Sequence, residues 1–355
     1  MEIPNKLKII QELSRGQFGE VFLCENSYLS NRKEAVKFIS TKSKDEKEKI
    51  KELKENLFES SVLEYLKKSP YIVNIYDAEI LNSGFRINME FLENGSIQEL
   101  LKKQDFLNIK QIIKISECVL HALEHAHNKH ILHLDIKPGN ILIKNENIYK
   151  LSDFGLANVK SEDGTSSFKK IYTAHYPPER LAGSLTEATE QSDIYMFGVT
   201  LYRLLNGESY FANQWHDKRI KNTLKDSIIA GKFPNRGKYL PHVNSKIKKI
   251  VNKCLDIDLN KRYQNVREIR NDFGKIKMEY CWIPKNITAE LQHWECLCNE
   301  NLFLELIAEK KDSYWDMSLY KFGPSKKTRI VKHCGTKLDN KSFYKKANKI
   351  FNEFL

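Results

Sequence analysis

The sequence predicts an α+β protein in which a β-rich N-terminal part is followed by a helical part. Residues 7–39 and 72–91 contain short apolar runs separated by turn residues, a pattern typical of antiparallel strands. From Ile109 to Ala126, apolar residues recur at helical spacing instead. The chain has 355 residues, which suits one large domain or two ordinary ones, and its 41% hydrophobic content is enough to fill a core.

Composition and charge narrow the class of protein. No apolar run approaches the ~18 residues that a membrane span needs, and the N-terminus Met1–Pro4 is not typical of a signal peptide, so we expect no membrane association. The seven cysteines are scattered and odd in number, which predicts reduced thiols in the cytoplasm rather than a disulfide framework. The formal net charge of +12 favours acidic partners without identifying one.

Three strands are expected between Leu7 and Ile39. At the first turn, Gly16 and Gly19 allow a hairpin backbone to lie close over phosphate groups, because glycine has no Cβ. An ordinary glycine-containing hairpin explains this pair equally well. The third strand carries Lys37, and a lysine on an otherwise apolar strand needs a partner unless it points to solvent from a sheet edge.

A charged segment after Lys42 becomes amphipathic between Leu57 and Leu66, which predicts a helix. Glu59 lies on the core-facing side of this helix, seven residues before Leu66, and is our choice as the partner of Lys37. Glu55, one turn earlier, is the alternative.

The stretch His133–Asn140 carries an acid, a lysine and an amide within eight residues. Asp135 can accept a proton from a hydroxyl nucleophile, and Lys137 can neutralise charge on a phosphoryl group. Asn140 can hold a metal ion through its side-chain oxygen, and Asp153 follows as a second hard-oxygen ligand.

The order and spacing of these residues resemble the catalytic loop and the metal loop of protein kinases. Later motifs extend the resemblance, which runs from about residue 7 to about residue 277. Tyr176–Glu179 resembles the end of a kinase activation segment. In that family an Asp at the position of Asp193 bonds the catalytic-loop backbone, and an Arg at the position of Arg262 pairs with the Glu at the position of Glu179.

The resemblance implies a bilobal protein kinase fold. It places a β-rich N-lobe over residues 1–91, a helical C-lobe over residues 92–277 and an appendage over residues 278–355. It also implies ATP and Mg²⁺ as cofactors. The implied site consists of the catalytic residues Asp135 and Lys137, the metal ligands Asn140 and Asp153, and the cofactor-binding residues Leu13, Gly16, Gly19, Val21, Ala35, Lys37, Glu59, Met89, Glu90, Leu92 and Leu142.

The implied activity is transfer of the γ-phosphoryl group of ATP to protein Ser and Thr hydroxyls, including autophosphorylation. Lys137, two residues after Asp135, resembles the serine/threonine type rather than the tyrosine type. The alternatives are a kinase-like scaffold and a small-molecule kinase of the same fold. One departure concerns control: Leu134 replaces the Arg that pairs with an activation-loop phosphate in many kinases, and Leu has neither charge nor donors.

The chain from Met278 onward matches no pattern that we can name. Its three tryptophans argue against a disordered linker, and Leu302–Ile307 has the composition of a buried helix, so we expect a mainly helical appendage packed on the rest of the chain. The basic segment Lys321–Lys349 favours a solvated face over a binding patch, so we expect no nucleic acid, although an acidic partner stays open.

Several histidines and cysteines invite a metal-binding interpretation. The Cys-x-Cys spacing in the C-terminal region is tighter than in common structural zinc patterns, so we do not favour zinc there. We favour packing or surface roles for all of these residues: His121, His125, His127, His293, Cys296, Cys298, His333 and Cys334.

Overall fold

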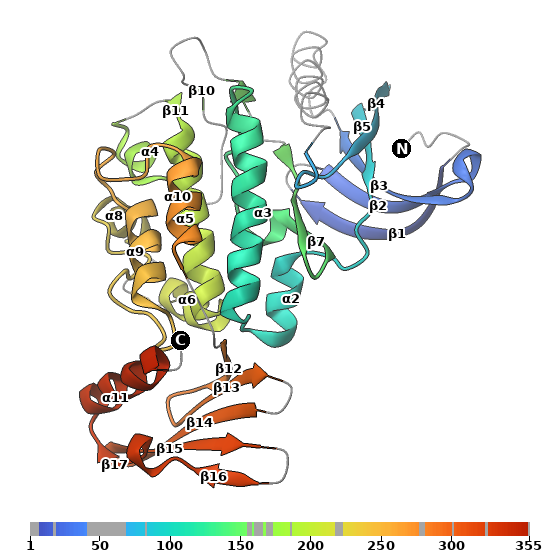
Figure 1. The fold of residues 1–355 in the computed structure, drawn as a ribbon. Helices are drawn as coiled ribbons and strands as arrows, with labels where there is room; N and C mark the ends of the chain where they lie inside the picture. Colours follow the sequence, from blue (N-terminus) through green and yellow to red (C-terminus); the bar gives the residue numbers. More distant parts are fainter. Residues whose placement is uncertain are drawn as a thin grey trace. The chain divides into compact units, whose positions relative to one another are not determined.

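The computed structural model describes residues 7–16, 19–40, 69–81, 84–154, 158–159, 166–167, 173–184, 187–216, 223–276, 281–299, 302–323 and 326–353. Figure 1 shows the helices and strands of the chain, coloured along the sequence. Contacts between residues divide the chain into two compact units. Unit 1 comprises residues 1–97, 118–171 and 185–193, and unit 2 comprises residues 98–117, 172–184 and 194–355. No helix in these described stretches is long and apolar enough to cross a membrane.

Unit 1 is built on a five-stranded antiparallel sheet with the strand order β1-β2-β3-β5-β4. A short helix, η1 (Ser27–Leu29), links the second and third strands. The strands are β1 (Leu7–Gly16), β2 (Gly19–Asn26), β3 (Arg32–Ser40), β4 (Ile75–Leu81) and β5 (Gly84–Glu90). The three strands expected before Ile39 are confirmed, while the fourth begins at Ile75 because Ile72 forms only a bridge to Leu151.

Short hairpins and bridges complete unit 1. They are β6 (Ile131–Leu132) with β9 (Asn158–Val159), β7 (Ile141–Asn145) with β8 (Ile148–Leu151), and β10 (Ser166–Ser167) with β11 (Glu187–Ala188). The turn η2 (Pro138–Asn140) lies between β6 and β7 along the chain. The predicted helix that carries Glu55 and Glu59 lies outside the described residues.

Two long helices have residues assigned to both units. They are α3 (Ile109–His127) and α5 (Glu190–Asn206). The remaining helices up to residue 276 are α2 (Ile97–Gln104), η4 (Thr173–His175), α4 (Pro178–Ala182), α6 (Glu208–His216), α8 (Leu224–Ile229), α9 (Ser245–Cys254) and α10 (Val266–Gly274). The expected change from a β-rich part to a helical part is confirmed.

The C-terminal region is mainly a β-sheet, so the prediction of a mainly helical appendage is wrong. The sheet has the strand order β12-β13-β14-β15-β16, and β17 also pairs with β15. Its elements are β12 (Trp282–Ile287), β13 (Leu291–Asn299), β14 (Leu302–Lys311), β15 (Tyr314–Phe322), β16 (Lys327–Arg329), η5 (Val331–His333), β17 (Gly335–Leu338) and the helix α11 (Asn340–Glu353).

The misread segment is β14. Its apolar run was too short to separate strand from helix by composition. In the structure Leu304, Leu306 and Ala308 are buried, while Glu305 and Ile307 between them are more exposed, which is the period of two that a strand requires.

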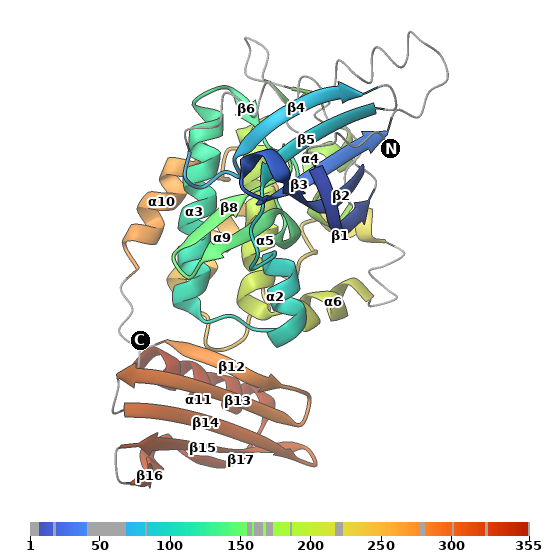
Figure 2. The ribbon, with the colours of Figure 1, turned by 90° about the vertical axis from the view of Figure 1, so that its right-hand side faces the viewer.

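One face of this sheet packs against α11, as Figure 2 shows behind strands β12 to β15. The helix contributes Phe343, Ala347, Ile350 and Phe351, whose spacing gives one apolar face. The strands contribute Trp282, Trp294, Cys296, Leu304, Leu306, Ala308, Trp315, Met317 and Leu319.

This sheet-and-helix core also contacts the preceding helical region within unit 2. The ring of Phe351 meets that of His242 edge-on, with centroids 6.2 Å apart. The thiol of Cys281 donates to Asn108 Oδ1 at 3.6 Å. These contacts tie the appended region to α3 and to the loop before α9.

Candidate active site

A buried carboxylate, Asp193 at the start of α5, fixes the backbone of the loop after β6. Its Oδ2 accepts from the N–H of His133 at 2.9 Å, and its Oδ1 accepts from the N–H of Leu134 at 2.7 Å. The imidazole Nε2 of His127 lies 2.8 Å from the same Oδ2. Burial would lower the pKa of His127, but hydrogen bonds with Asp193 and Glu190 raise it above its usual value. The expected contact between Asp193 and the loop backbone is therefore confirmed.

His133 connects this loop to the segment that carries Asp153. Its Nε2 lies 3.0 Å from the carbonyl oxygen of Ser152, and its Nδ1 accepts from the N–H of Asp135 at 3.1 Å. Since Nδ1 accepts, Nε2 carries the proton in the neutral ring. The ring is fully buried against Phe154, and burial lowers the pKa of His133, which keeps it neutral.

Asp135 receives two side-chain donors on one oxygen. Lys137 Nζ donates to Asp135 Oδ2 at 2.6 Å, and Asn140 Nδ2 donates to the same oxygen at 2.9 Å. A further bond from Asn140 Nδ2 to the carbonyl oxygen of Asp135, at 2.8 Å, closes the loop on itself. Burial raises the pKa of Asp135, and Lys137 offsets only part of that shift.

Asp153 faces Lys37 across unit 1. Lys37 Nζ donates to Asp153 Oδ1 at 2.8 Å, although 116 residues separate the two in the sequence. Burial would raise the pKa of Asp153, but the charge of Lys37 and its hydrogen bond hold the pKa below its usual value. Asp153 and Leu134 both have positive φ angles, 62° and 63°, which cost about 1–3 kcal/mol each for non-glycine residues and are typical of functional sites.

The hairpin of β1 and β2 brings Gly16 opposite Gly19. Gly19 has a φ of 116°, and a Cβ there would lie 2.2 Å from the carbonyl oxygen of Phe38, so only glycine fits. Gln17 and Phe18 at the tip lie outside the described residues.

The expected adenine pocket residues come from neighbouring strands of unit 1. Val21 stands opposite Lys37 in the β2–β3 register, and Ala35 stands opposite Met89 in the β3–β5 register. Leu142 bridges to Ser96 in the segment after β5. Leu13 lies on β1, and Leu92 is buried just after β5.

The carboxylate of Glu90, at the end of β5, contacts two lysines. Lys150 Nζ donates to Glu90 Oε2 at 2.5 Å, and Lys144 Nζ lies 3.4 Å from Glu90 Oε1. Burial would raise the pKa of Glu90, but Lys150, together with the backbone of Asn74 and the charge of Lys144, holds the pKa below its usual value. The backbone N–H of Glu90 is also bonded, to the carbonyl oxygen of Asn74 at 2.8 Å.

The activation-segment motif ends in a buried ion pair within unit 2. Glu179, in the first turn of α4, accepts from both Nη atoms of Arg262 at 2.9 Å. Both side chains are almost fully buried, so the predicted pair is confirmed. Ser161 and Thr165 lie outside the described residues, while Ser166 and Ser167 form β10.

Sequence reasoning missed three residues that organise the site. His127 was expected to be a packing or surface residue, yet it binds the carboxylate that fixes the loop. His133 had no predicted role. Lys150 could have been noticed, because a lysine in the apolar run Ile148–Leu151 needs a buried partner.

The residues weighed for zinc do not come together as a set. Cys296 is buried on the face that packs against α11, with its Sγ 3.9 Å from Cys298 Sγ. Cys334 donates to the carbonyl oxygen of Ile330, and His333 lies 3.2 Å from Glu353. Among the described residues, His293 groups instead with two glutamates.

The comparisons with known proteins show which family the sequence matches. The sequence matches the protein kinase domain family over residues 7–273. It is 29% identical over 270 residues to a probable serine/threonine-protein kinase PknB of Lactococcus lactis, covering 76% of this chain and 41% of that protein. It is 29% identical over 272 residues to the serine/threonine-protein kinase PrkC of Bacillus subtilis, covering 76% and 40%. A third relative is the serine/threonine-protein kinase nekl-2 of Caenorhabditis elegans, 30% identical over 269 residues, covering 71% and 70%. The chain spans about two fifths of the length of the two bacterial relatives.

Proposed function

Because this chain belongs to the protein kinase family, we propose that it is a serine/threonine protein kinase that phosphorylates Ser and Thr hydroxyls of proteins, including its own. Family membership implies ATP binding and protein substrates. The observation that carries the finer proposal is the convergence of Asp135, Lys137, Asn140, Lys37 and Asp153 in unit 1.

Asp135 is the residue that we assign to the nucleophile. Its Oδ2 is occupied by Lys137 and Asn140, so the second oxygen, Oδ1, is the one we assign to the substrate hydroxyl. A carboxylate in this position orients the hydroxyl and accepts its proton as the bond to phosphorus forms. Lys137 can neutralise charge on the phosphoryl group from the same side.

Lys37, Asp153 and Asn140 serve the phosphates. Lys37 would bind the α- and β-phosphates, and the hairpin of Gly16 and Gly19 would cover them. The donor set fits a hard cation: Asn140 turns its amide N–H to Asp135 and Asp153 turns Oδ1 to Lys37, which assigns Asn140 Oδ1 and Asp153 Oδ2 to Mg²⁺. When bound, Mg²⁺ neutralises charge on the β- and γ-phosphoryl oxygens.

The adenine would lie against the apolar side chains named above, and its edge would bond the backbone from Glu90 to Leu92. The pair of Glu90 with Lys150 supports this role, because it holds the end of β5 in one position. Glu59 stays our proposed second partner for Lys37. The lobe boundaries at residues 91 and 277 and a cytoplasmic location also stay predictions.

A phosphotransfer assay tests the proposal on the full chain. Radiolabelled ATP and generic protein substrates are supplied to the wild type, to Asp135→Asn and to a control, Asp312→Asn, on the exposed turn before β15. We expect Asp135→Asn to lose about 10²–10⁴-fold in turnover, the usual worth of a positioned base, and the control to match the wild type.

Analysis of the labelled residues separates the alternatives. Phosphoserine and phosphothreonine are expected, because Lys137 contacts the catalytic carboxylate in the manner of the serine/threonine type. Labelling dominated by phosphotyrosine would contradict the specificity. Equal turnover by wild type and Asp135→Asn would contradict the site, and labelling of small hydroxyl compounds without protein would favour a small-molecule kinase.

A further inference from the structure

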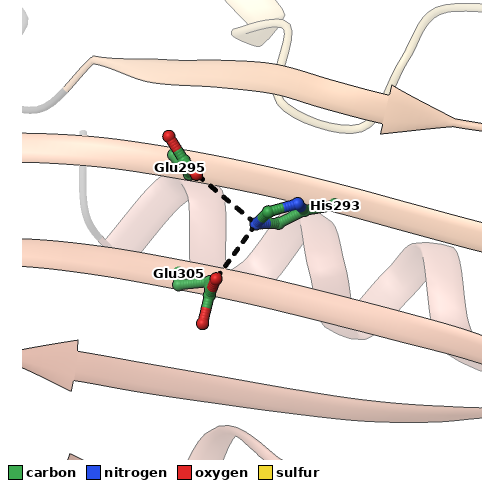
Figure 3. Close-up of side chains that lie close together, drawn as sticks. All are labelled: His293, Glu295 and Glu305. Carbon is green, nitrogen blue, oxygen red and sulfur yellow. Dashed lines mark ion pairs between the residues drawn. The ribbon is translucent and has the colours of Figure 1, made fainter. Parts of the chain in front are cut away.

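A second charged cluster lies on the C-terminal sheet, on the face opposite to α11. His293 and Glu295 are two residues apart on β13 and therefore share a face. Glu305 on β14 stands directly opposite Glu295 in the strand register. Trp294, between the two β13 residues, points the other way into the core. Figure 3 shows the imidazole of His293 reaching between the two carboxylates.

His293, Glu295 and Glu305 each direct one possible ligand atom inward, and these three atoms are close enough to bind one ion. His293 Nε2 lies 3.2 Å from Glu305 Oε1 and 3.8 Å from Glu295 Oε1, and the three possible ligand atoms lie within 4.8 Å of one another. A tetrahedral ion with bonds of about 2.0–2.1 Å would hold its ligand atoms roughly 3.3 Å apart. We propose that His293, Glu295 and Glu305 form a binding site for a divalent transition-metal ion of the zinc type.

Two lysines orient the carboxylates without occupying the inward oxygens. Lys285 Nζ lies 3.0 Å from Glu295 Oε2, and Lys327 Nζ lies 3.3 Å from Glu305 Oε2. In both glutamates the oxygen that faces His293 is the other one, Oε1. Outer partners of this kind fix ligating carboxylates in known metal sites. Lys327 is itself positioned by the rings of Tyr320 and Phe322, 4.1 and 4.7 Å from its Nζ.

The facing glutamates favour a cation between their inward oxygens. Glutamates directly opposite on neighbouring strands repel each other, so this pair needs a cation between its inward oxygens. His293 Nε2 is buried yet makes no hydrogen bond within the part of the chain that the structure describes. In the neutral ring an unprotonated Nε2 that faces two carboxylate oxygens has the arrangement of a metal ligand set, whereas a protonated ring would form ion pairs with the same oxygens.

The ligand types select the ion. Imidazole suits zinc, copper, iron and nickel, whereas sites for magnesium and calcium use oxygen ligands. One histidine and two glutamates supply three ligands, which leaves a fourth tetrahedral position for water. The two lysines add positive charge beside the ion, so the affinity should be lower than at a site of thiolates. The proposal does not depend on kinase activity.

Metal titration of the full chain tests the site. To remove the candidate active-site ligand, all proteins carry Asp153→Asn and are stripped with chelator. Zinc chloride is titrated by calorimetry into the otherwise unchanged protein, into His293→Ala, into Glu305→Gln and into Glu309→Gln. Glu309 is the matched control, because it is an exposed glutamate on the same strand and face as Glu305 but outside the cluster.

We expect one zinc equivalent to be lost in His293→Ala and in Glu305→Gln, and retained in Glu309→Gln. Zinc should also raise the melting temperature only of the proteins that bind it, since an ion that binds the folded state stabilises it. Equal stoichiometry and affinity in all four proteins would overturn the proposal, because any zinc bound would then lie elsewhere.

Cobalt provides a measurement that needs no substitution. Co²⁺ bound by one nitrogen and oxygens should give visible absorption bands of a tetrahedral ion without the charge-transfer bands of a thiolate ligand. Thiolate bands would place the ion on the cysteines and overturn the proposal. The absence of tetrahedral bands at saturating cobalt would overturn it as well, and would leave a protonated His293 as the cation between the glutamates.

Discussion

The candidate active site and the charged cluster on the face of the C-terminal sheet, called here the sheet-face cluster, contain the same kinds of side chain in different arrangements. The candidate active site has two carboxylates, Asp135 and Asp153, the lysines Lys37 and Lys137, and the histidine His133. The sheet-face cluster has Glu295 and Glu305, Lys285 and Lys327, and His293.

The histidine marks the difference between the two groups. Both ring nitrogens of His133 have backbone partners, so this residue positions others and offers no ligand atom. Among the described residues, His293 Nε2 has no hydrogen-bond partner, and it faces one oxygen of each of two glutamates. Residue composition alone therefore does not distinguish a positioning histidine from a ligand; the partners of each nitrogen do.

The largest expected effect separates the two groups by activity. Asp153→Asn or Lys37→Ala should lower phosphotransfer by at least about 10²-fold, because we propose that both residues, which bond each other, serve the phosphates and the metal ion rather than the core. The double variant Glu295→Gln/Glu305→Gln should keep wild-type turnover. A radiolabel assay with circular dichroism checks both activity and fold. Equal turnover by Asp153→Asn and the wild type would contradict the site assignment.

The next effect contrasts the two faces of β13. Trp294→Ala should lower the free energy of unfolding of the sheet by about 3–5 kcal/mol, because Trp294 is fully buried beneath α11. Leu297→Ala, 65% exposed on the same strand, should stay within about 0.5 kcal/mol of the wild type. Denaturant titration followed by tryptophan fluorescence measures both. Equal midpoints for the two variants would contradict the packing described.

Limited proteolysis extends this test to the whole appended region. We expect the sheet to be an integral part of the fold, because Phe351 packs on His242 and Cys281 bonds Asn108. A protease should therefore not release a smaller stable product. Clean release of a domain ending near residue 277, with unchanged activity and melting temperature, would refute it.

A smaller effect compares the two histidines directly. His133→Ala should cost about 1–3 kcal/mol of stability, because it leaves the buried carbonyl of Ser152 and the N–H of Asp135 without their side-chain partner. His293→Ala in chelator should stay within about 0.5 kcal/mol, since His293 lies on a partly exposed face. Denaturant titration measures the free energy of unfolding of both variants. Equal losses would remove the distinction drawn between the two.

The pH profile addresses the catalytic carboxylate alone. Burial raises the pKa of Asp135, and the protonated form cannot accept a proton, so kcat should fall with decreasing pH sooner than an ordinary aspartate would predict. Lys137 lowers this pKa, so Lys137→Met should move the acidic limb to higher pH. Steady-state kinetics across pH measures the acidic limb of the wild type and of Lys137→Met. Superimposable limbs would mean that another group controls the profile.

The smallest effect is expected from the activation loop. Leu134 is fully buried and offers no donor, so a loop phosphate lacks the charge-assisted bond, worth about 1–3 kcal/mol, that an arginine would supply. Replacing Ser161, Thr165, Ser166 and Ser167 together with Ala, or treating the protein with phosphatase, should change activity less than about tenfold. Thr173 is left unchanged because we predict that it lies near the peptide site, where its loss would lower activity for a separate reason. A loss of about a hundredfold or more, with the fold intact, would show control by phosphate.

Motif spacing predicted the loop of Asp135, Lys137 and Asn140 because these three residues are local in sequence. Asp135, Lys137 and Asn140 lie within one turn and its flanks, and their mutual bonds follow from that spacing. The contacts of His127 and Lys150 were missed because each depends on a partner about 60 residues away.

The C-terminal sheet was misread for a different reason. Leu302–Ile307 carries apolar side chains on both faces of β14, so the alternation of a strand was hidden in the composition. Phe303 is apolar but packs against Phe322 on the open face, at a centroid distance of 5.2 Å. Only the pairing with β13 and β15 separates the two faces.

The burial of Leu134 also bears on protein engineering. A designer who wished to make this kinase respond to a loop phosphate would begin with Leu134→Arg. The side chain starts from a fully enclosed position and a left-handed backbone, with its N–H bonded to Asp193. A guanidinium there must either reach solvent or remain as an unpaired buried charge, which costs several kcal/mol. Installing the switch therefore requires at least a second substitution that opens an exit for the new side chain.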